Sequence, residues 1–182
     1  MADKEKHGHD KHSRRSVRLK DYDYSQQGAY FVTICAKNRA CLFGEIVDGA
    51  MCLNQSGESI QRIWYELPNR YTNLDLDAFI LMPNHLHGIV VLTDNAAVGA
   101  PLAAPFPGRA SPAPTLGGIV RTFKSISAML LHRLLSRKGR PLWQRNYYEH
   151  IIRNEKSLNA IRDYILNNPN RWSDDPDNPE TF

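Results

Sequence analysis

The sequence has few cysteines, and none stands in a pattern typical of disulfides or metal sites. Cys35, Cys41 and Cys52 are an odd number without CxxC spacing, which argues against a disulfide scaffold or a cysteine-ligated zinc site and favours a reducing cytoplasm. No apolar run approaches the roughly 18 residues of a transmembrane helix, and the N-terminus lacks the apolar core of a secretory signal. The 182 residues are 42% hydrophobic and 23% charged, which is ordinary for one soluble globular domain.

Acidic residues are scarce in one part of the chain. The net charge is only +4, but residues 119–153 hold eight Lys or Arg residues and a single acidic residue. A local positive field of this kind favours a polyanionic partner such as nucleic acid. A solvated helix face is the alternative interpretation of the same pattern.

The chain is expected to form one α+β domain over residues 17–172. Residues 1–16 predict a disordered basic tail, 94–118 a mobile loop rich in Pro, Ala and Gly, and 173–182 a C-terminal tail. Periodicity and turn residues predict the following elements: strands at 29–36 and 41–47, a hairpin within 75–92 that turns at Pro83-Asn84, an extended segment at 142–148, and helices at 55–67, 116–136 and 155–167. This order predicts an antiparallel, ferredoxin-like sheet with helices packed on it.

Two histidines in the predicted hairpin stand two positions apart. His85 and His87 would leave the same face of a strand, from which both imidazoles could bind one divalent cation. Zinc hydrolases and cupin barrels use the same His-x-His spacing, and a purely structural pair is a further alternative.

The last predicted helix carries Tyr164 and Asn168 at i and i+4, a spacing that puts them on one helix face. An amide oxygen can complete a site for a hard metal ion, and a phenol oxygen can attack phosphorus. A half-buried packing residue is the alternative role for such a tyrosine.

Four segments of the chain carry a resemblance to a known family. They are Tyr-Phe-Val-Thr at 30–33, Leu-Met-Pro-Asn-His-Leu-His-Gly-Ile-Val at 81–90, Leu-Trp-Gln-Arg-Asn-Tyr-Tyr-Glu-His-Ile-Ile-Arg-Asn at 142–154, and Asp-Tyr-Ile-Leu-Asn-Asn-Pro at 163–169. Together they resemble the REP-associated tyrosine transposases, which are single-tyrosine members of the HUH nuclease superfamily. The resemblance covers about residues 20–172 and implies the HUH-type transposase fold.

The resemblance implies a mechanism as well as a fold. His85 and His87 would hold Mg²⁺ or Mn²⁺, with Asn168 as the third ligand at the position where related transposases often have glutamine. The metal would polarise the scissile phosphate of single-stranded DNA. Tyr164 would attack the phosphorus and form a 5′-phosphotyrosine link. Tyr147 and Tyr148 compete with Tyr164 for the role of nucleophile.

The implied partner is single-stranded DNA with palindromic, hairpin-forming ends. A monomer or homodimer in the bacterial cytoplasm, associated with the nucleoid and not with a membrane, would serve this function. Tyr148 could stack on unpaired bases and His150 could contact phosphate. The remaining expected phosphate contacts are Arg121, Lys124, Arg145 and Arg153.

Three functions from different classes are consistent with these residues. The first is the metal-dependent DNA strand transferase, which requires both the histidine pair and Tyr164. The second is a domesticated relative that binds DNA hairpins without cutting them. The third is a zinc-dependent hydrolase of small substrates, which would need His85 but not Tyr164. The intact histidine and tyrosine sets favour the first.

Overall fold

The computed structural model describes residues 23–94, 115–136 and 139–179 of the chain. None of the helices within these ranges combines the length and the apolarity that crossing a membrane requires. The elements in chain order are β1 (Gly28–Cys35), η1 (Lys37–Arg39), β2 (Gly44–Val47), β3 (Ala50–Leu53), α1 (Gln55–Tyr65), β4 (Leu74–Leu81), β5 (His85–Leu92), α2 (Leu116–Leu134), β6 (Tyr148–Ile152), α3 (Glu155–Asn167) and η2 (Pro169–Asp174), where η denotes a 3₁₀ helix.

The main sheet has the strand order β4-β5-β1-β6, and all its neighbours are antiparallel. With α1 between β1 and β4, and α2 between β5 and β6, this is the split β-α-β-β-α-β arrangement of a ferredoxin-like fold. The predicted fold class is therefore confirmed. Strands β2 and β3 form a separate hairpin around Asp48 and Gly49.

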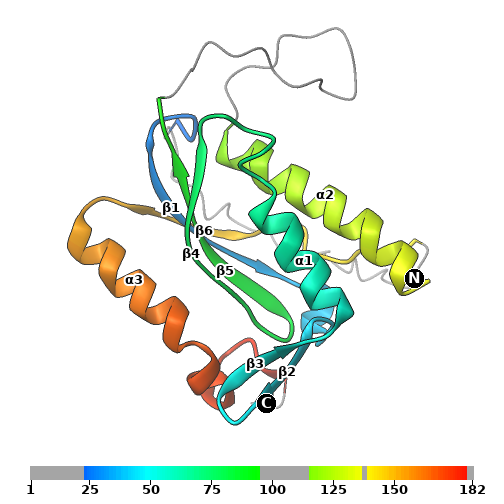
Figure 1. The fold of residues 1–182 in the computed structure, drawn as a ribbon. Helices are drawn as coiled ribbons and strands as arrows, with labels where there is room; N and C mark the ends of the chain where they lie inside the picture. Colours follow the sequence, from blue (N-terminus) through cyan, green and yellow to red (C-terminus); the bar gives the residue numbers. More distant parts are fainter. Residues whose placement is uncertain (1–22, 95–114, 137–138, 180–182) are drawn as a thin grey trace, which may run out of the picture.

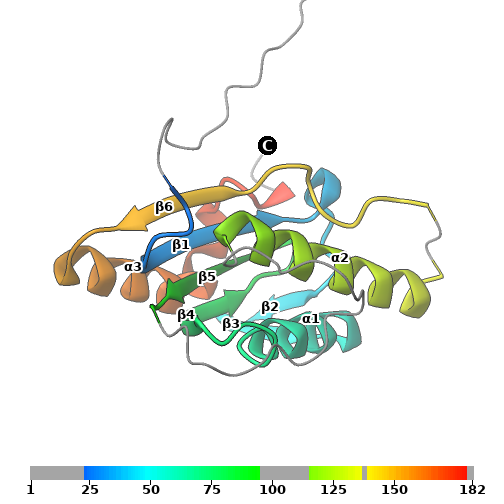
Figure 2. The ribbon, with the colours of Figure 1, turned by 90° about the horizontal axis from the view of Figure 1, so that it is seen from above.

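The helices are divided between the two faces of the sheet (Figures 1 and 2). Helices α1 and α2 lie side by side over one face, where Tyr30, Val32 and Ile34 of β1 point into the larger core. Helix α3 covers part of the other face, where Ile165 packs on Phe31 in a smaller core. Alternation along the strands thus produces two faces, and α3 faces the odd-numbered side chains of β1 and β5.

Some boundaries differ from the sequence prediction. Residues 142–147 form one isolated bridge, between Trp143 and Ala36 just after β1, and the strand itself begins at Tyr148. Strand β3 was not predicted as a separate element. The packed chain continues past residue 172, because Asp175 and Asn178 are buried. The predicted tail at 1–16 and most of the predicted loop at 94–118 fall outside the described residues.

Candidate active site

The two histidines of β5 meet at one point on the α3 face of the sheet. Both side chains are buried, and their Nε2 atoms lie 3.1 Å apart. The other ring nitrogen of each histidine, Nδ1, makes a hydrogen bond. His85 Nδ1 lies 2.8 Å from Asn84 Oδ1, and His87 Nδ1 lies 2.8 Å from Thr33 Oγ1. Two nitrogens at this separation are close enough to bind one cation. The predicted pairing of His85 and His87 is therefore present.

A third candidate metal ligand comes from a segment in which no site residue was predicted. Asp175 follows η2, and its Oδ2 lies 4.0 Å from His85 Nε2. One ligand atom from each of His85, His87 and Asp175 lies within 4.8 Å of the others, and all three residues are buried. Asp175 stands in a polar, proline-containing stretch without periodicity, so only the path of the folded chain reveals it.

Tyr164 comes from α3 to the same point. Its phenol oxygen lies 3.3 Å from His87 Nε2, and its ring packs edge-on against Phe31 with centroids 6.0 Å apart. Tyr164 as a residue is 40% exposed, whereas both histidines are buried. The structure thus brings together the predicted nucleophile and the predicted metal ligands.

Helix α3 is fixed over the sheet by an ion pair and an apolar contact. Arg162 donates through Nε and Nη2 to the two carboxylate oxygens of Asp77 in β4, at 2.8 and 2.5 Å. Ile165 is fully buried in the smaller core. These two contacts flank Tyr164 in the sequence and hold this part of α3 against the sheet, which positions Tyr164 relative to β5.

Asn168 ends α3 with an amide buried beside the tyrosine. Its Oδ1 is buried and has no hydrogen-bond donor among the described residues. A buried acceptor without a donor is costly unless a cation or another donor occupies the space beside it. An amide oxygen, like the two imidazoles and the Asp175 carboxylate, is a kind of ligand that divalent cations accept in proteins.

The charges of the site suit metal binding at neutral pH. Burial lowers the pKa of His85 and His87, and the neighbouring His85 lowers that of His87 further. Both rings are therefore neutral near pH 7, which is the form that binds metal ions. Burial raises the pKa of the Tyr164 phenol, and the hydrogen bond from Asn168 acts in the opposite direction. A protonated phenol is a weak nucleophile, so its activation requires additional positive charge.

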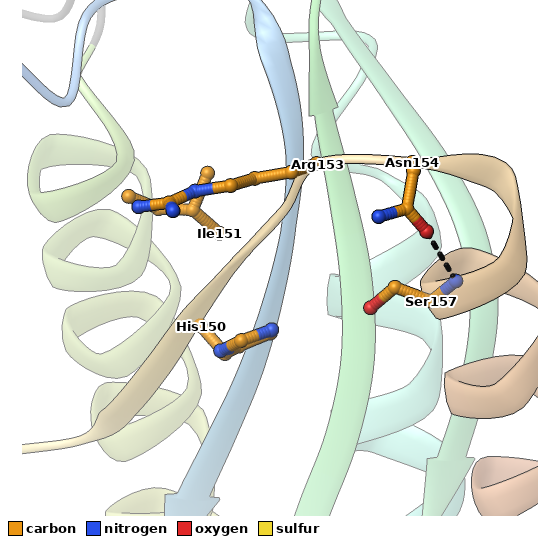
Figure 3. Close-up of a pocket in the computed structure, with 5 residues that line it drawn as sticks. All are labelled: His150, Ile151, Arg153, Asn154 and Ser157. Atoms are coloured by element: carbon orange, nitrogen blue, oxygen red, sulfur yellow. Dashed lines mark hydrogen bonds between the residues drawn. The ribbon is translucent and has the colours of Figure 1, made fainter.

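The predicted DNA contacts divide between the two faces. In the strand register, Thr33 lies opposite both His87 and Tyr148, and His150 lies opposite Phe31, so all of these residues share one face of the sheet. Tyr148 is half exposed there and contacts Phe31 edge-on. His150 and Arg153 line a surface pocket of about 340 Å³ between the end of β6 and the start of α3 (Figure 3).

The other predicted contacts do not lie beside the histidines. Arg121 and Lys124 belong to α2, on the opposite face of the sheet. The Lys124 ammonium donates to the carbonyls of Gln144 and Asn146, at 3.0 and 2.9 Å, and Arg145 is exposed between these two residues. Lys124 therefore binds residues 144–146 to α2. A role for Arg121, Lys124 or Arg145 in binding DNA stays a prediction.

The comparisons with known proteins agree with the fold. Among solved structures, the chain is similar to a REP-associated tyrosine transposase bound to a REP hairpin, with a TM-score of 0.55, 19% identity, and coverage of 87% of this chain and 80% of that one. At this identity the similarity establishes the fold, and it confirms the fold-level resemblance stated from the sequence. No protein-family model matches the chain.

One relative is close enough in sequence to establish a family. An uncharacterized protein from Haemophilus influenzae is 42% identical over 170 residues, which span 90% of this chain and 92% of that protein. The chain belongs to the same family as this Haemophilus influenzae protein.

Proposed function

We propose that the protein is a metal-dependent transposase-type nuclease that cleaves and rejoins single-stranded DNA through a 5′-phosphotyrosine intermediate. The observation that carries the proposal is the position of the Tyr164 phenol, 3.3 Å from His87 Nε2 at the edge of a buried donor cluster. A packing tyrosine needs no such neighbour, and a zinc hydrolase of small substrates needs no tyrosine there. The solved transposase of the same fold is bound to a REP hairpin, which supports a hairpin-forming DNA as the substrate class.

The residues of the chain would divide the reaction between them. His85, His87, Asp175 and Asn168 would hold Mg²⁺ or Mn²⁺. When bound, the cation would supply the positive charge that polarises the scissile phosphate and lowers the pKa of a nearby phenol. The Tyr164 oxygen would give its proton to water and bond to phosphorus. The bond from phosphorus to the 3′-oxygen breaks, and the leaving oxygen takes up a proton to become a 3′-hydroxyl.

The covalent bond to Tyr164 would conserve the phosphodiester energy, so that the reverse attack by a 3′-hydroxyl rejoins a strand without a nucleotide cofactor. Tyr148 would offer a half-exposed ring for stacking an unpaired base on the same face. His150 and Arg153 would contact the backbone phosphate beside the pocket. A DNA substrate of this kind would place the protein at the nucleoid in the cytoplasm.

The proposal is tested by trapping the covalent adduct on a denaturing gel. The protein is mixed with labelled single-stranded hairpin DNA, taken from palindromes flanking the gene, in the presence of Mn²⁺ or of EDTA. We expect an adduct with Mn²⁺ that is absent with EDTA and absent in Tyr164→Phe. Tyr65→Phe is the matched control, because Tyr65 is similarly exposed but belongs to α1 on the opposite face.

Two results would contradict the proposal. An adduct that persists in Tyr164→Phe would transfer the role of nucleophile to Tyr147 or Tyr148. Salt-sensitive binding to every hairpin tested, with no adduct, would instead indicate a DNA-hairpin-binding protein that does not cut.

A further inference from the structure

The two histidines are held at Nδ1 by different kinds of partner. Neutral imidazole carries one N–H and one bare nitrogen, and only a bare nitrogen can bind a cation. The partner at Nδ1 therefore decides whether Nε2 is available. The partner of His85 is the amide of Asn84, and the partner of His87 is the hydroxyl of Thr33.

The amide of Asn84 has only one orientation that satisfies its neighbours. Its Nδ2 donates to the backbone carbonyls of Arg39 and Asp177, at 3.0 and 2.7 Å. Both carbonyls are acceptors only, so the amino group must face them and Oδ1 must face His85. Asn84 is 1% exposed, so a flipped amide would leave several buried groups unsatisfied.

We propose that Asn84 is a positioning residue that locks His85 in the Nδ1–H tautomer and keeps its Nε2 bare for the cation. The Oδ1 of Asn84 can only accept, and it lies 2.8 Å from His85 Nδ1, so this nitrogen must be the one that carries hydrogen. The inference rests on the proposed metal-dependent function for its purpose, but the tautomer itself is a property of the metal-free protein.

His87 has the opposite tautomer before metal binds. With Nε2 of His85 bare, the 3.1 Å contact between the two Nε2 atoms requires the hydrogen on His87. Its Nδ1 then accepts from the Thr33 hydroxyl, 2.8 Å away. A hydroxyl can rotate to accept instead, whereas the amide of Asn84 is fixed. His85 is thus preset, and His87 exchanges its hydrogen between the two nitrogens when the cation binds while Thr33 reverses its role.

The tautomers are measured by long-range ¹H–¹⁵N NMR of ¹⁵N-labelled, metal-free protein near neutral pH, followed by titration with Mg²⁺. We expect His85 to show the Nδ1–H pattern throughout, and His87 to change from Nε2–H to Nδ1–H as Mg²⁺ is added. A His85 that carries hydrogen on Nε2 in the metal-free wild type would overturn the proposal without any variant. Retention of Nε2–H on His87 with bound Mg²⁺ would overturn the part assigned to Thr33.

Variants of Asn84 distinguish an effect on the His85 tautomer from an effect on folding. Asn84→Ala should release the His85 tautomer and weaken Mn²⁺ binding by about 10- to 100-fold, the usual effect of losing such a partner. Asn84→Asp keeps an acceptor at His85 and should retain the tautomer, although it loses the donors to Arg39 and Asp177. If Asn84→Ala fails to fold, the wild-type spectrum and Asn84→Asp still decide. A correct tautomer in a protein that forms no DNA adduct would refute the proposed function and leave this inference intact.

Discussion

Gly88 directly follows His87, and a methyl group at this position should loosen the strand that carries the histidines. Gly88 points to the α1 and α2 face, where it lies against the indole of Trp64. A Cβ added there would stand 3.0 Å from Cη2 and 3.2 Å from Cε2 of that ring, and closer still to Cζ2. The indole has little room to retreat, because it stacks on Phe79 at 5.1 Å and meets Phe123 edge-on at 5.4 Å.

The cost of Gly88→Ala follows from these contacts. Overpacking of this kind costs about 1–3 kcal/mol, and the lower entropy of the unfolded alanine chain offsets about 0.4–1 kcal/mol. We therefore expect a net loss of about 1–2 kcal/mol in the free energy of unfolding. For a chain of this size that lowers the melting temperature by about 2–8 °C, which is measured by calorimetry or by circular dichroism during heating.

Two further variants test the cause. Gly118→Ala is the matched control, because among the described residues a Cβ in that helical position would meet only Thr115 Oγ1, at 3.5 Å, and it should stabilise by about 0.4–1 kcal/mol. Trp64→Phe removes the atoms that clash, so adding Gly88→Ala to it should cost less than adding it to the wild type. An unchanged melting temperature in Gly88→Ala, or equal costs in the two backgrounds, would refute the packing argument.

Three further predictions concern the larger core, the docking of α3 and the DNA contact. Ser127→Ala removes the acceptor of the buried Trp143 indole N–H, 2.8 Å away, and should cost about 1–3 kcal/mol in urea unfolding; a change below 0.5 kcal/mol, a threshold of roughly half the net value of one hydrogen bond, would speak against it. Arg162→Gln breaks the pair with Asp77 that holds α3, and should slow adduct formation in single-turnover assays while the melting temperature hardly moves; an unchanged rate would mean that the pair does not position the tyrosine. Arg153→Gln should weaken hairpin binding equally for all sequences and reduce the slope of log K against log salt by about 1; an unchanged slope would exclude a phosphate contact.

The elements with clear periodicity or capping were predictable from the sequence. Helix α3 has the predicted bounds Glu155–Asn167, because Asn154 caps it through the N–H of Ser157 and Pro169 follows its end. The hairpin of β4 and β5 was predictable from its apolar runs and the Pro83-Asn84 turn. Strand alternation alone put His85 and His87 on one face.

The remaining features depend on contacts between distant residues. The segment 142–147 looks like a strand because Leu142 and Trp143 are apolar, but both residues pack in the larger core, and continuous pairing with β1 begins only at Tyr148. Asp175 reaches the histidines because contacts of Asp177 hold the following turn against the domain. The backbone carbonyl of Asp177 accepts a hydrogen bond from Asn84, and the Asp177 carboxylate lies 3.0 Å from Arg39 Nε. The secondary-structure propensity of neighbouring residues does not predict contacts between residues so far apart in the sequence.

The identity of the residue that bonds to DNA tests the central claim most directly. The covalent adduct formed with Mn²⁺ is digested with nuclease and trypsin, and the nucleotide-bearing peptide is sequenced by mass spectrometry. We expect the added nucleotide mass on Tyr164, within the tryptic peptide of residues 163–171. The same mass on the peptide of residues 146–153, which contains Tyr147 and Tyr148, would contradict it.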